Sequence, residues 1–175
     1  YTYTDRELKK QLRHDGFVYV LSPYSLVWEN DRYYLIGNYD KYDNLSNYRL
    51  DRIKNLSILN DKLRDASEIL GENADLKIEE YVKTSIYLYG SPEKIRLKLR
   101  CQPELLDDLT DFFGNDLTVI NNADSLEVSI AVQDSEGLIF WLMQHGKNLE
   151  VLGPENVRNR LVSTLKETLR LYTWK

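Results

Sequence analysis

The sequence has few of the residues that build catalytic and metal centres. It contains one cysteine and two histidines among 175 residues, so a transition-metal site would depend on carboxylates, and we expect no metal. A phosphate-binding glycine loop, a dinucleotide glycine fingerprint and a serine-nucleophile elbow are all absent. The sequence therefore predicts a protein that is not an enzyme and needs no cofactor.

Long hydrophobic runs and an excess of positive charge are also absent. No apolar stretch approaches the roughly 20 residues of a membrane-spanning helix, and no signal-peptide pattern opens the chain, so we expect a cytoplasmic protein without membrane contact. The net charge is −5, with 13 basic and 15 acidic side chains in residues 1–90 and 10 and 13 in residues 91–175. Because duplex DNA is bound mainly through its phosphates, neither half is expected to bind duplex strongly.

The single cysteine and the first residue each carry a small prediction. Cys101 cannot form an intrachain disulfide, and its place in an alternating apolar run predicts packing rather than reactivity. The chain begins at Tyr1 rather than at methionine, and a strand-like pattern follows at once. We therefore expect a fragment of a longer protein.

The first half has a strand-like pattern followed by two helical segments. Apolar and aromatic residues alternate from Phe17 to Trp28, a polar turn follows at 29–32, and residues 32–37 form the predicted return strand of a hairpin. After a second turn a strand is predicted over Tyr48–Ile53, which completes a small, strongly bent β structure. Helices are predicted from Asp61, as N-cap, to Leu70 before Gly71, and over 78–89.

The turn Gly90-Ser91-Pro92 marks the predicted domain boundary, which gives domains 1–90 and 91–175. The elements beyond it follow the order βαββαβ with one further helix, which indicates a split-βαβ, ferredoxin-like sheet in an α+β protein. The predicted ranges are strand 94–101, helix 103–113, strands 117–121 and 126–132, helix 135–145, strand 149–152 and helix 154–172.

Tyrosine is concentrated near the start of the chain, where nine of the 13 tyrosines lie in the first 48 residues. One interpretation is a β structure in which the rings pack against one another. The other is a platform that stacks bases or encloses a planar ligand.

The predicted strand Tyr48–Ile53 adds charge to this aromatic region. Strand alternation would place Tyr48 and Arg52 on one face and Arg49 and Asp51 on the other. Two guanidinium groups suit phosphate or carboxylate recognition, and a neighbouring ring adds stacking. The alternative is a surface ion pair between Arg49 and Asp51, worth about 1 kcal/mol or less.

Three segments, Tyr19–Trp28, Tyr33–Gly37 and Tyr48–Ile53, resemble the WYL domain in content and order, with Tyr33 at the position of the family's eponymous tryptophan. Residues 78–90 resemble the helix that leaves that domain. Residues 94–101, 141–146 and 151–154 resemble the family's C-terminal extension, WCX.

The resemblance implies an Sm-like, SH3-type β-barrel followed by a ferredoxin-like domain, with a winged helix-turn-helix upstream. It implies a ligand sensor whose ligands include nucleic acid. Carried over by position, the ligand-binding candidates are Ser22, Tyr24, Tyr34, Tyr48, Arg49 and Arg52.

The leading hypothesis is the ligand-sensing part of a bacterial transcriptional regulator, which forms a homodimer and reaches duplex DNA only through an upstream domain. Its effector is expected to be anionic, a short single-stranded nucleic acid or a nucleotide. The alternative is a structural dimerisation module without a ligand. A nucleic-acid enzyme is disfavoured because the acidic residues are scattered among turns and helix faces.

Overall fold

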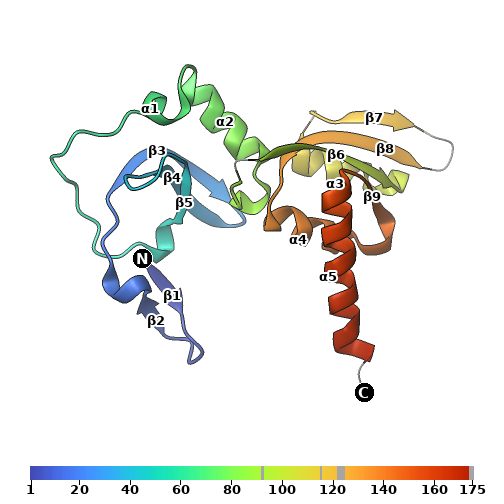
Figure 1. Ribbon diagram of the computed structural model, residues 1–175, viewed down its shortest axis with the longest axis horizontal. Coiled ribbons are helices and arrows are strands. Elements are labelled where there is room, and N and C mark those ends of the chain that lie inside the picture. Colours follow the sequence, from blue (N-terminus) through green and yellow to red (C-terminus); the bar gives the residue numbers. More distant parts are fainter. Residues whose placement is uncertain (92, 115, 122–124, 174–175) are drawn as a thin grey trace. The chain divides into compact units, whose positions relative to one another are not determined.

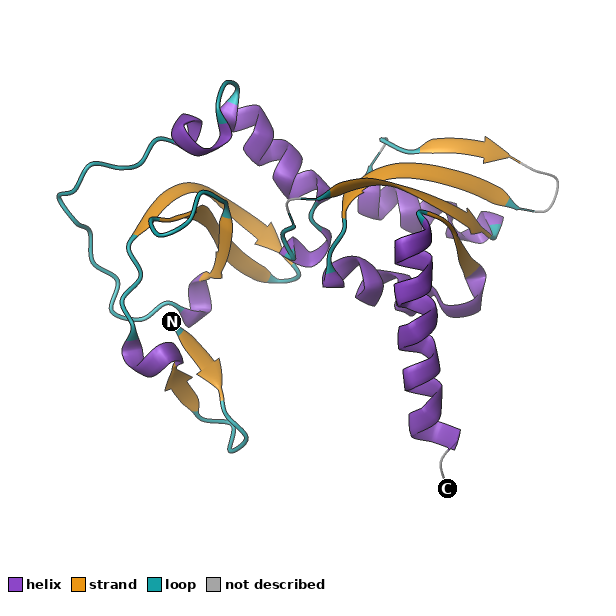
Figure 2. Cartoon of the chain, in the orientation of Figure 1, coloured by secondary structure: helices purple, strands orange, loops and turns teal. Residues whose placement is uncertain are grey.

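The computed structural model describes residues 1–91, 93–114, 116–121 and 125–173, and these divide into two compact units, Tyr1–Tyr81 and Val82–Lys175. Helices and antiparallel sheets occur in both units, so the expected α+β class is confirmed (Figures 1 and 2). The division comes before the turn at 90–92 because Ile86 already belongs to the second unit's core; Pro92 of that turn lies outside the described residues. Within the described ranges, no helix is long and apolar enough to cross a membrane.

The first unit is built on a three-stranded antiparallel sheet in the order β3-β4-β5. Its strands are β3 (Leu21–Glu29), β4 (Arg32–Tyr39) and β5 (Ser46–Arg49), and a separate hairpin pairs β1 (Thr2–Thr4) with β2 (Lys10–Leu12). The predicted β3–β4 hairpin is confirmed. Its two-residue turn, Asn30-Asp31, has positive φ at both positions (47° and 56°), which matches the twist of the flanking strands.

The expected closed barrel is not formed by the described residues. The predicted strand 48–53 ends at Arg49 and continues as a 3₁₀ turn, η2 (Leu50–Arg52), in which the Ile53 N–H donates to the Leu50 carbonyl at 3.1 Å. The hairpin β1–β2 reaches this region through side chains: Thr2 Oγ1 donates to the Arg52 carbonyl at 3.2 Å. Without a backbone ladder between β1 and β5, the sheet stays open.

Two helices complete the first unit. The cap of α1 (Ala66–Leu70) is Asp65 rather than the predicted Asp61, because Asp65 accepts from the Ser67 N–H in a capping box. Gly71 ends α1 with φ 73°, as predicted. The helix α2 (Ala74–Thr84) begins and ends earlier than predicted, and Asn47 of β5 donates to the Tyr81 hydroxyl at 2.9 Å. The helix is thereby attached to one face of the sheet.

The second unit follows the predicted βαββαβ order. Its antiparallel sheet has the strand order β7-β8-β6-β9, as in a split βαβ unit (Figure 1). Helices α3 and α4 cover the same face of this sheet, since both contribute to one core and the rings of Phe113 and Trp141 lie 5.0 Å apart. The 3₁₀ turns η3 (Ile86–Leu88) and η4 (Pro103–Leu105) precede β6 and α3. The remaining bounds are β6 (Lys94–Cys101), α3 (Leu106–Phe113), β7 (Thr118–Asn121), β8 (Leu126–Gln133), α4 (Glu136–His145), β9 (Leu149–Gly153) and α5 (Glu155–Thr173).

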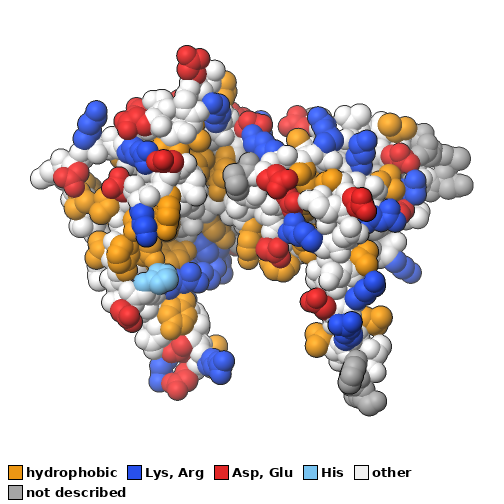
Figure 3. Space-filling model, viewed as in Figure 1, with side chains coloured by type: hydrophobic (Ala, Val, Ile, Leu, Met, Phe, Trp, Pro, Cys, Tyr) orange, Lys and Arg blue, Asp and Glu red, His pale blue; other side chains and the backbone are white. Residues whose placement is uncertain are grey.

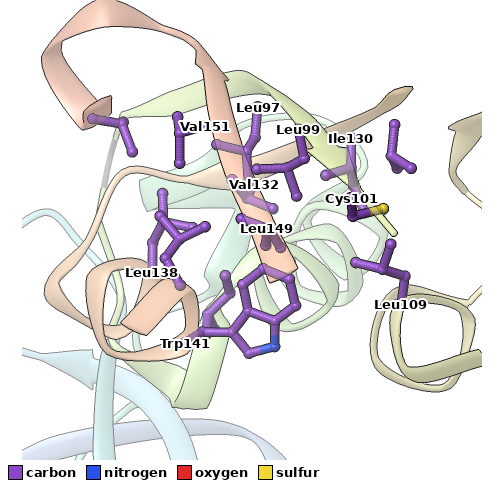
Figure 4. Close-up of a cluster of buried hydrophobic side chains, with 14 of the residues drawn as sticks. Leu97, Leu99, Cys101, Leu109, Ile130, Val132, Leu138, Trp141, Leu149 and Val151 are labelled. Atoms are coloured by element: carbon purple, nitrogen blue, oxygen red, sulfur yellow. The ribbon is translucent and has the colours of Figure 1, made fainter. Parts of the chain in front are cut away.

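Apolar side chains from the sheet and both helices meet in one core (Figure 4). Alternate residues of β6 and β8 point inward, including Leu97 and Leu99, and Leu138 and Trp141 of α4 close the core from the other side. Cys101 is buried among them as a free thiol, and burial raises its pKa, as predicted for a packing residue. This unit therefore has a continuous hydrophobic core.

The start of α5 is fixed by ion pairs. Arg160 pairs with Asp134, whose side chain is almost fully buried, and with Glu136 at 2.9 Å, while Asn156 donates to Asp134 at 3.0 Å. Val157 and Leu161 of α5 join the core. The last turns of α5 extend away from the sheet (Figure 1), and their large apolar side chains are exposed.

Candidate anion-binding site

Arg49 holds the Asp51 carboxylate where β5 passes into η2, and the charges of Arg52 and Arg32 also act on this carboxylate. Arg49 donates to Asp51 from two nitrogens, with Nε–Oδ1 at 3.1 Å and Nη2–Oδ2 at 2.8 Å. These hydrogen bonds lower the pKa of the Asp51 carboxyl, and the positive charges of Arg49, Arg52 and Arg32 lower it further, against an opposing effect of partial burial. We call Arg32, Arg49 and Arg52 the arginine cluster, with Asp51 at its centre.

Arg52 contributes a buried donor without a partner among the described residues. Its Nε is inaccessible to solvent and makes no hydrogen bond there, while its carbonyl accepts from Thr2. An N–H of a guanidinium group can only donate, so leaving it unpaired in the interior costs on the order of 1–3 kcal/mol. An anionic ligand could reach this donor only after the side chain of Arg52 has moved.

Tyrosines border the cluster on two sides of the sheet. Tyr34 lies opposite Arg49 in the β4–β5 register and therefore shares its face. Tyr48 points to the other face, where its ring lies 5.8 Å from Tyr1 and 6.1 Å from Tyr19. The Tyr1 hydroxyl also accepts from the backbone N–H of Arg49 at 3.1 Å. The prediction that Tyr48 and Arg52 share a strand face assumed a strand through residue 53, and that strand is wrong because β5 ends at Arg49.

Ser22 and Tyr24 form hydrogen bonds with the backbone of Arg64. Ser22 Oγ accepts from the Arg64 N–H at 3.0 Å, and the Tyr24 hydroxyl donates to the Arg64 carbonyl at 3.0 Å, beside a bulge in β3. Ser22 pairs with Asn38, four residues along β4 from Tyr34. These two candidates therefore lie at the opposite end of β4 from the residues around Arg49.

A cavity of about 570 Å³ lies beside Tyr24, between the β3 bulge and the two helices. Its carboxylates include Asp65, which is already engaged as the cap of α1. The other lining residues are Pro23, Leu63, Ala66, Ser67, Asn73, Ala74, Asp75, Leu76 and Ile78. Among the described residues no arginine lines this cavity, so the arginine cluster is better suited to bind an anion.

Sequence reasoning missed Arg32 and Tyr1 as members of this site. Arg32 opens β4 directly after the hairpin turn, two residues before Tyr34, and strand alternation puts both on one face. That signal was available in the sequence. The position of Tyr1 was not, because it depends on how the β1–β2 hairpin approaches β5 in space.

Charge is otherwise mixed. Basic and acidic side chains are interspersed over most of the visible face in Figure 3. The described residues contain no group of three or more His, Cys, Asp or Glu able to hold a metal ion. His145 ends α4, and its ring packs against Trp141 at 4.4 Å. The arginine cluster is thus a local basic spot in an acidic chain.

Comparison with known proteins gives two domain matches. Residues 2–58 match the WYL domain, and residues 93–169 match the WCX domain; together they cover about three quarters of the chain. In Bacillus subtilis (strain 168), the HTH-type transcriptional regulator YobV is 24% identical over 173 residues, 98% of this chain and 50% of YobV. The chain thus spans about half the length of this curated relative.

Among solved structures, the proteasome accessory factor B/C (PafBC) of Arthrobacter aurescens aligns with 88% of this chain and 22% of its own, with a TM-score of 0.40 and 16% identity. The order of the two matched domains along the chain is the one that the sequence motifs predicted. The chain therefore belongs to the WYL-domain family and joins a WYL domain to a C-terminal WCX domain.

Proposed function

We propose that this chain is the sensing part of a bacterial transcriptional regulator, and that its WYL domain binds an anionic effector at the arginine cluster. The observation that carries the proposal is that Arg49 already holds a carboxylate through two of its nitrogens, while the charges of Arg52 and Arg32 also act on that carboxylate. The regulator named among its relatives supports the regulatory part. Binding would shift the populations of two states of a longer protein in the cytoplasm.

The donors of the cluster favour phosphate as the group recognised. Arg49 and Arg52 offer planar, always charged forks that match phosphate oxygens, and Arg32 adds long-range attraction. Tyr34 on the same face is a candidate for stacking on a base, whereas Tyr48 lies on the opposite face and would support the sheet through its ring contacts with Tyr1 and Tyr19. A nucleotide or a short single strand combines these two chemistries. Under this proposal Ser22 and Tyr24 act indirectly, through the segment around Arg64 that they hold.

Fluorescence anisotropy with labelled single strands of about five nucleotides tests this proposal. The 175-residue chain should bind them in a salt-sensitive manner, because phosphate contacts release counterions. Replacing both Arg49 and Arg52 with alanine should abolish binding. The matched control replaces Arg158 and Arg170, exposed arginines of α5, which removes the same charge elsewhere. Equal loss of affinity in both double variants would contradict a localised site.

Contact with duplex DNA belongs, in this proposal, to another part of a longer regulator. The acidic balance of both halves and the HTH-type description of YobV support this view. A duplex long enough to stay paired should therefore bind this chain more weakly than the single strand. The chain acts without catalysis in this proposal, so intact oligonucleotide should be recovered after incubation.

A second candidate function, dimerisation, is favoured by one face of α5. Val162, Leu165 and Leu169 are exposed at heptad-like spacing on the projecting part of this helix, and Tyr172 continues the series. Burial of this stripe between two copies would make the chain a homodimer. Sedimentation equilibrium should then give twice the monomer mass, and Leu165→Lys with Leu169→Lys should give monomers. A monomeric wild-type chain would exclude this role.

A further inference from the structure

Asp51 occupies the same donors of Arg49 that an anionic ligand would use. We propose that Asp51 is a resident competitor in the arginine cluster, whose carboxylate must be exchanged for a phosphate group when the effector binds. This inference rests on the proposed function, because it assigns a regulatory residue within that site.

The contact geometry supports competition. Asp51 receives hydrogen bonds from both Nε and Nη2 of Arg49, at 3.1 and 2.8 Å, which is the two-pronged arrangement that Arg also makes with phosphate. A phosphate cannot take this arrangement while the carboxylate holds it. Asp51 is therefore an internal imitation of the ligand.

The position of Asp51 allows the exchange. Its side chain is 45% exposed and that of Arg49 is 24% exposed, so the ion pair lies at the surface and can open into solvent. Asp51 sits two residues from Arg49 within the 3₁₀ turn η2. Rotation of its side chain is enough to release the guanidinium group, and β5 need not move.

Competition of this kind selects the ligand by charge. A carboxylate or a phosphodiester brings about one negative charge and gains little by replacing Asp51, whereas a terminal phosphate carries about −1.5 to −2 at pH 7 and three acceptor oxygens. We therefore expect preference for strands or nucleotides with a terminal phosphate over those without one.

The opposite role for Asp51 would be to hold Arg49 in the binding orientation. The two roles predict opposite results, because removal of a competitor strengthens binding and removal of an orienting partner weakens it. Asp51→Asn keeps the size of the side chain and removes its charge, whereas Asp51→Ser also shortens the side chain. An effect on binding that both variants share comes from the lost charge and not from a change in local packing.

The test titrates a labelled five-nucleotide strand, with and without a 5′-phosphate, into the full chain. Asp51→Asn and Asp51→Ser should bind the phosphorylated strand about five-fold more tightly than wild type, with a smaller gain for the unphosphorylated strand. The gain should vanish when Arg49→Ala is combined with Asp51→Asn. Wild-type binding that depends on Arg49 and Arg52 but is unchanged or weakened in both Asp51 variants would overturn the competitor role and leave the proposed function standing. No binding by any variant would overturn both.

Discussion

The two units of this chain are stabilised in different ways. Of the twenty buried hydrophobic side chains among the described residues, only Ile36 and Ile78 belong to the first unit. The other eighteen are in the second unit, mostly in the core between the sheet and α3 and α4. The first unit relies instead on half-buried tyrosines in edge-to-face contact and on side chains that bond to backbone, as around Arg64.

This difference separates a rigid frame from an adaptable surface. Close-packed apolar cores have few alternative arrangements, whereas units with few buried apolar contacts open locally at a lower free energy. Tyrosine rings and arginine forks keep polar atoms near the surface, where they can change partners. The unit that we propose to sense the effector is thus the one built for exchange of partners.

The largest expected effect comes from removing core volume in the second unit. Leu97 and Ile36 are both fully buried, one in each unit. Leu97→Ala should reduce the free energy of unfolding by about 4 kcal/mol, because it leaves a cavity in a packed core. Ile36→Ala should cost about 2 kcal/mol, because the open sheet around it can collapse more easily. Urea denaturation gives the free energy of unfolding of each variant. Hydrogen exchange of the backbone amides then shows which of the two units has lost stability.

An equal cost for the two substitutions would mean that the first unit is packed as tightly as the second. A larger cost for Ile36→Ala would reverse the comparison altogether. In either case loose packing of the first unit would not explain how the arginine cluster exchanges its partners.

A smaller effect is expected where glycine permits close approach of two segments. A Cβ at Gly137 would collide with the Ile86 carbonyl, and one at Gly37 would collide with the Ser22 carbonyl. Alanine at either position should destabilise its own unit by about 1–3 kcal/mol, because backbone must shift. Gly153→Ala is the control, since a Cβ at that position would meet no other atom within 4 Å. Thermal unfolding that is unaffected by Gly137→Ala would contradict the tight contact between η3 and α4.

Buried amides provide the next comparison. Asn38 is fully buried, and its Nδ2 donates to the Tyr42 and Asn44 carbonyls at 2.5 and 2.9 Å. Asn38→Ala should cost about 2 kcal/mol, because two carbonyls lose their donor. Faster amide exchange confined to residues 40–45 would show that Asn38 fixes this loop. Gln133, its fully buried counterpart in the second unit, bonds to Ser91 and Thr84, and Gln133→Ala should affect only that unit.

The sequence predicted the second unit better than the first. Its helices have continuous apolar faces and its strands alternate cleanly, so periodicity defined β6 and α4 to within a residue. In the first unit the strand predicted through Ile53 ended at Arg49, because a 3₁₀ turn and the Arg49–Asp51 pair depend on local contacts that alternation does not encode. The same limit explains why the candidate site was predicted only in part. The ion pair between Arg49 and Asp51, which the sequence offered as the alternative to ligand recognition, is formed, but the arrival of Arg32 and Tyr1 depends on tertiary contacts.

The smallest expected effect is a pH dependence confined to the second unit. His145 packs on Trp141, and burial lowers the pKa of its imidazole, with the Asp108 carboxylate acting in the opposite direction. The unfolded chain therefore takes up the proton more readily, so the stabilising contribution of neutral His145 is complete above about pH 7 and is lost as pH falls through 6.5 and below. His145→Gln should flatten this part of the stability curve between about pH 7.5 and 5.5, measured as the urea midpoint of the second unit by amide hydrogen exchange. A midpoint that falls equally in wild type and variant would assign the dependence to carboxylates, and the two units would then respond to acid by the same mechanism.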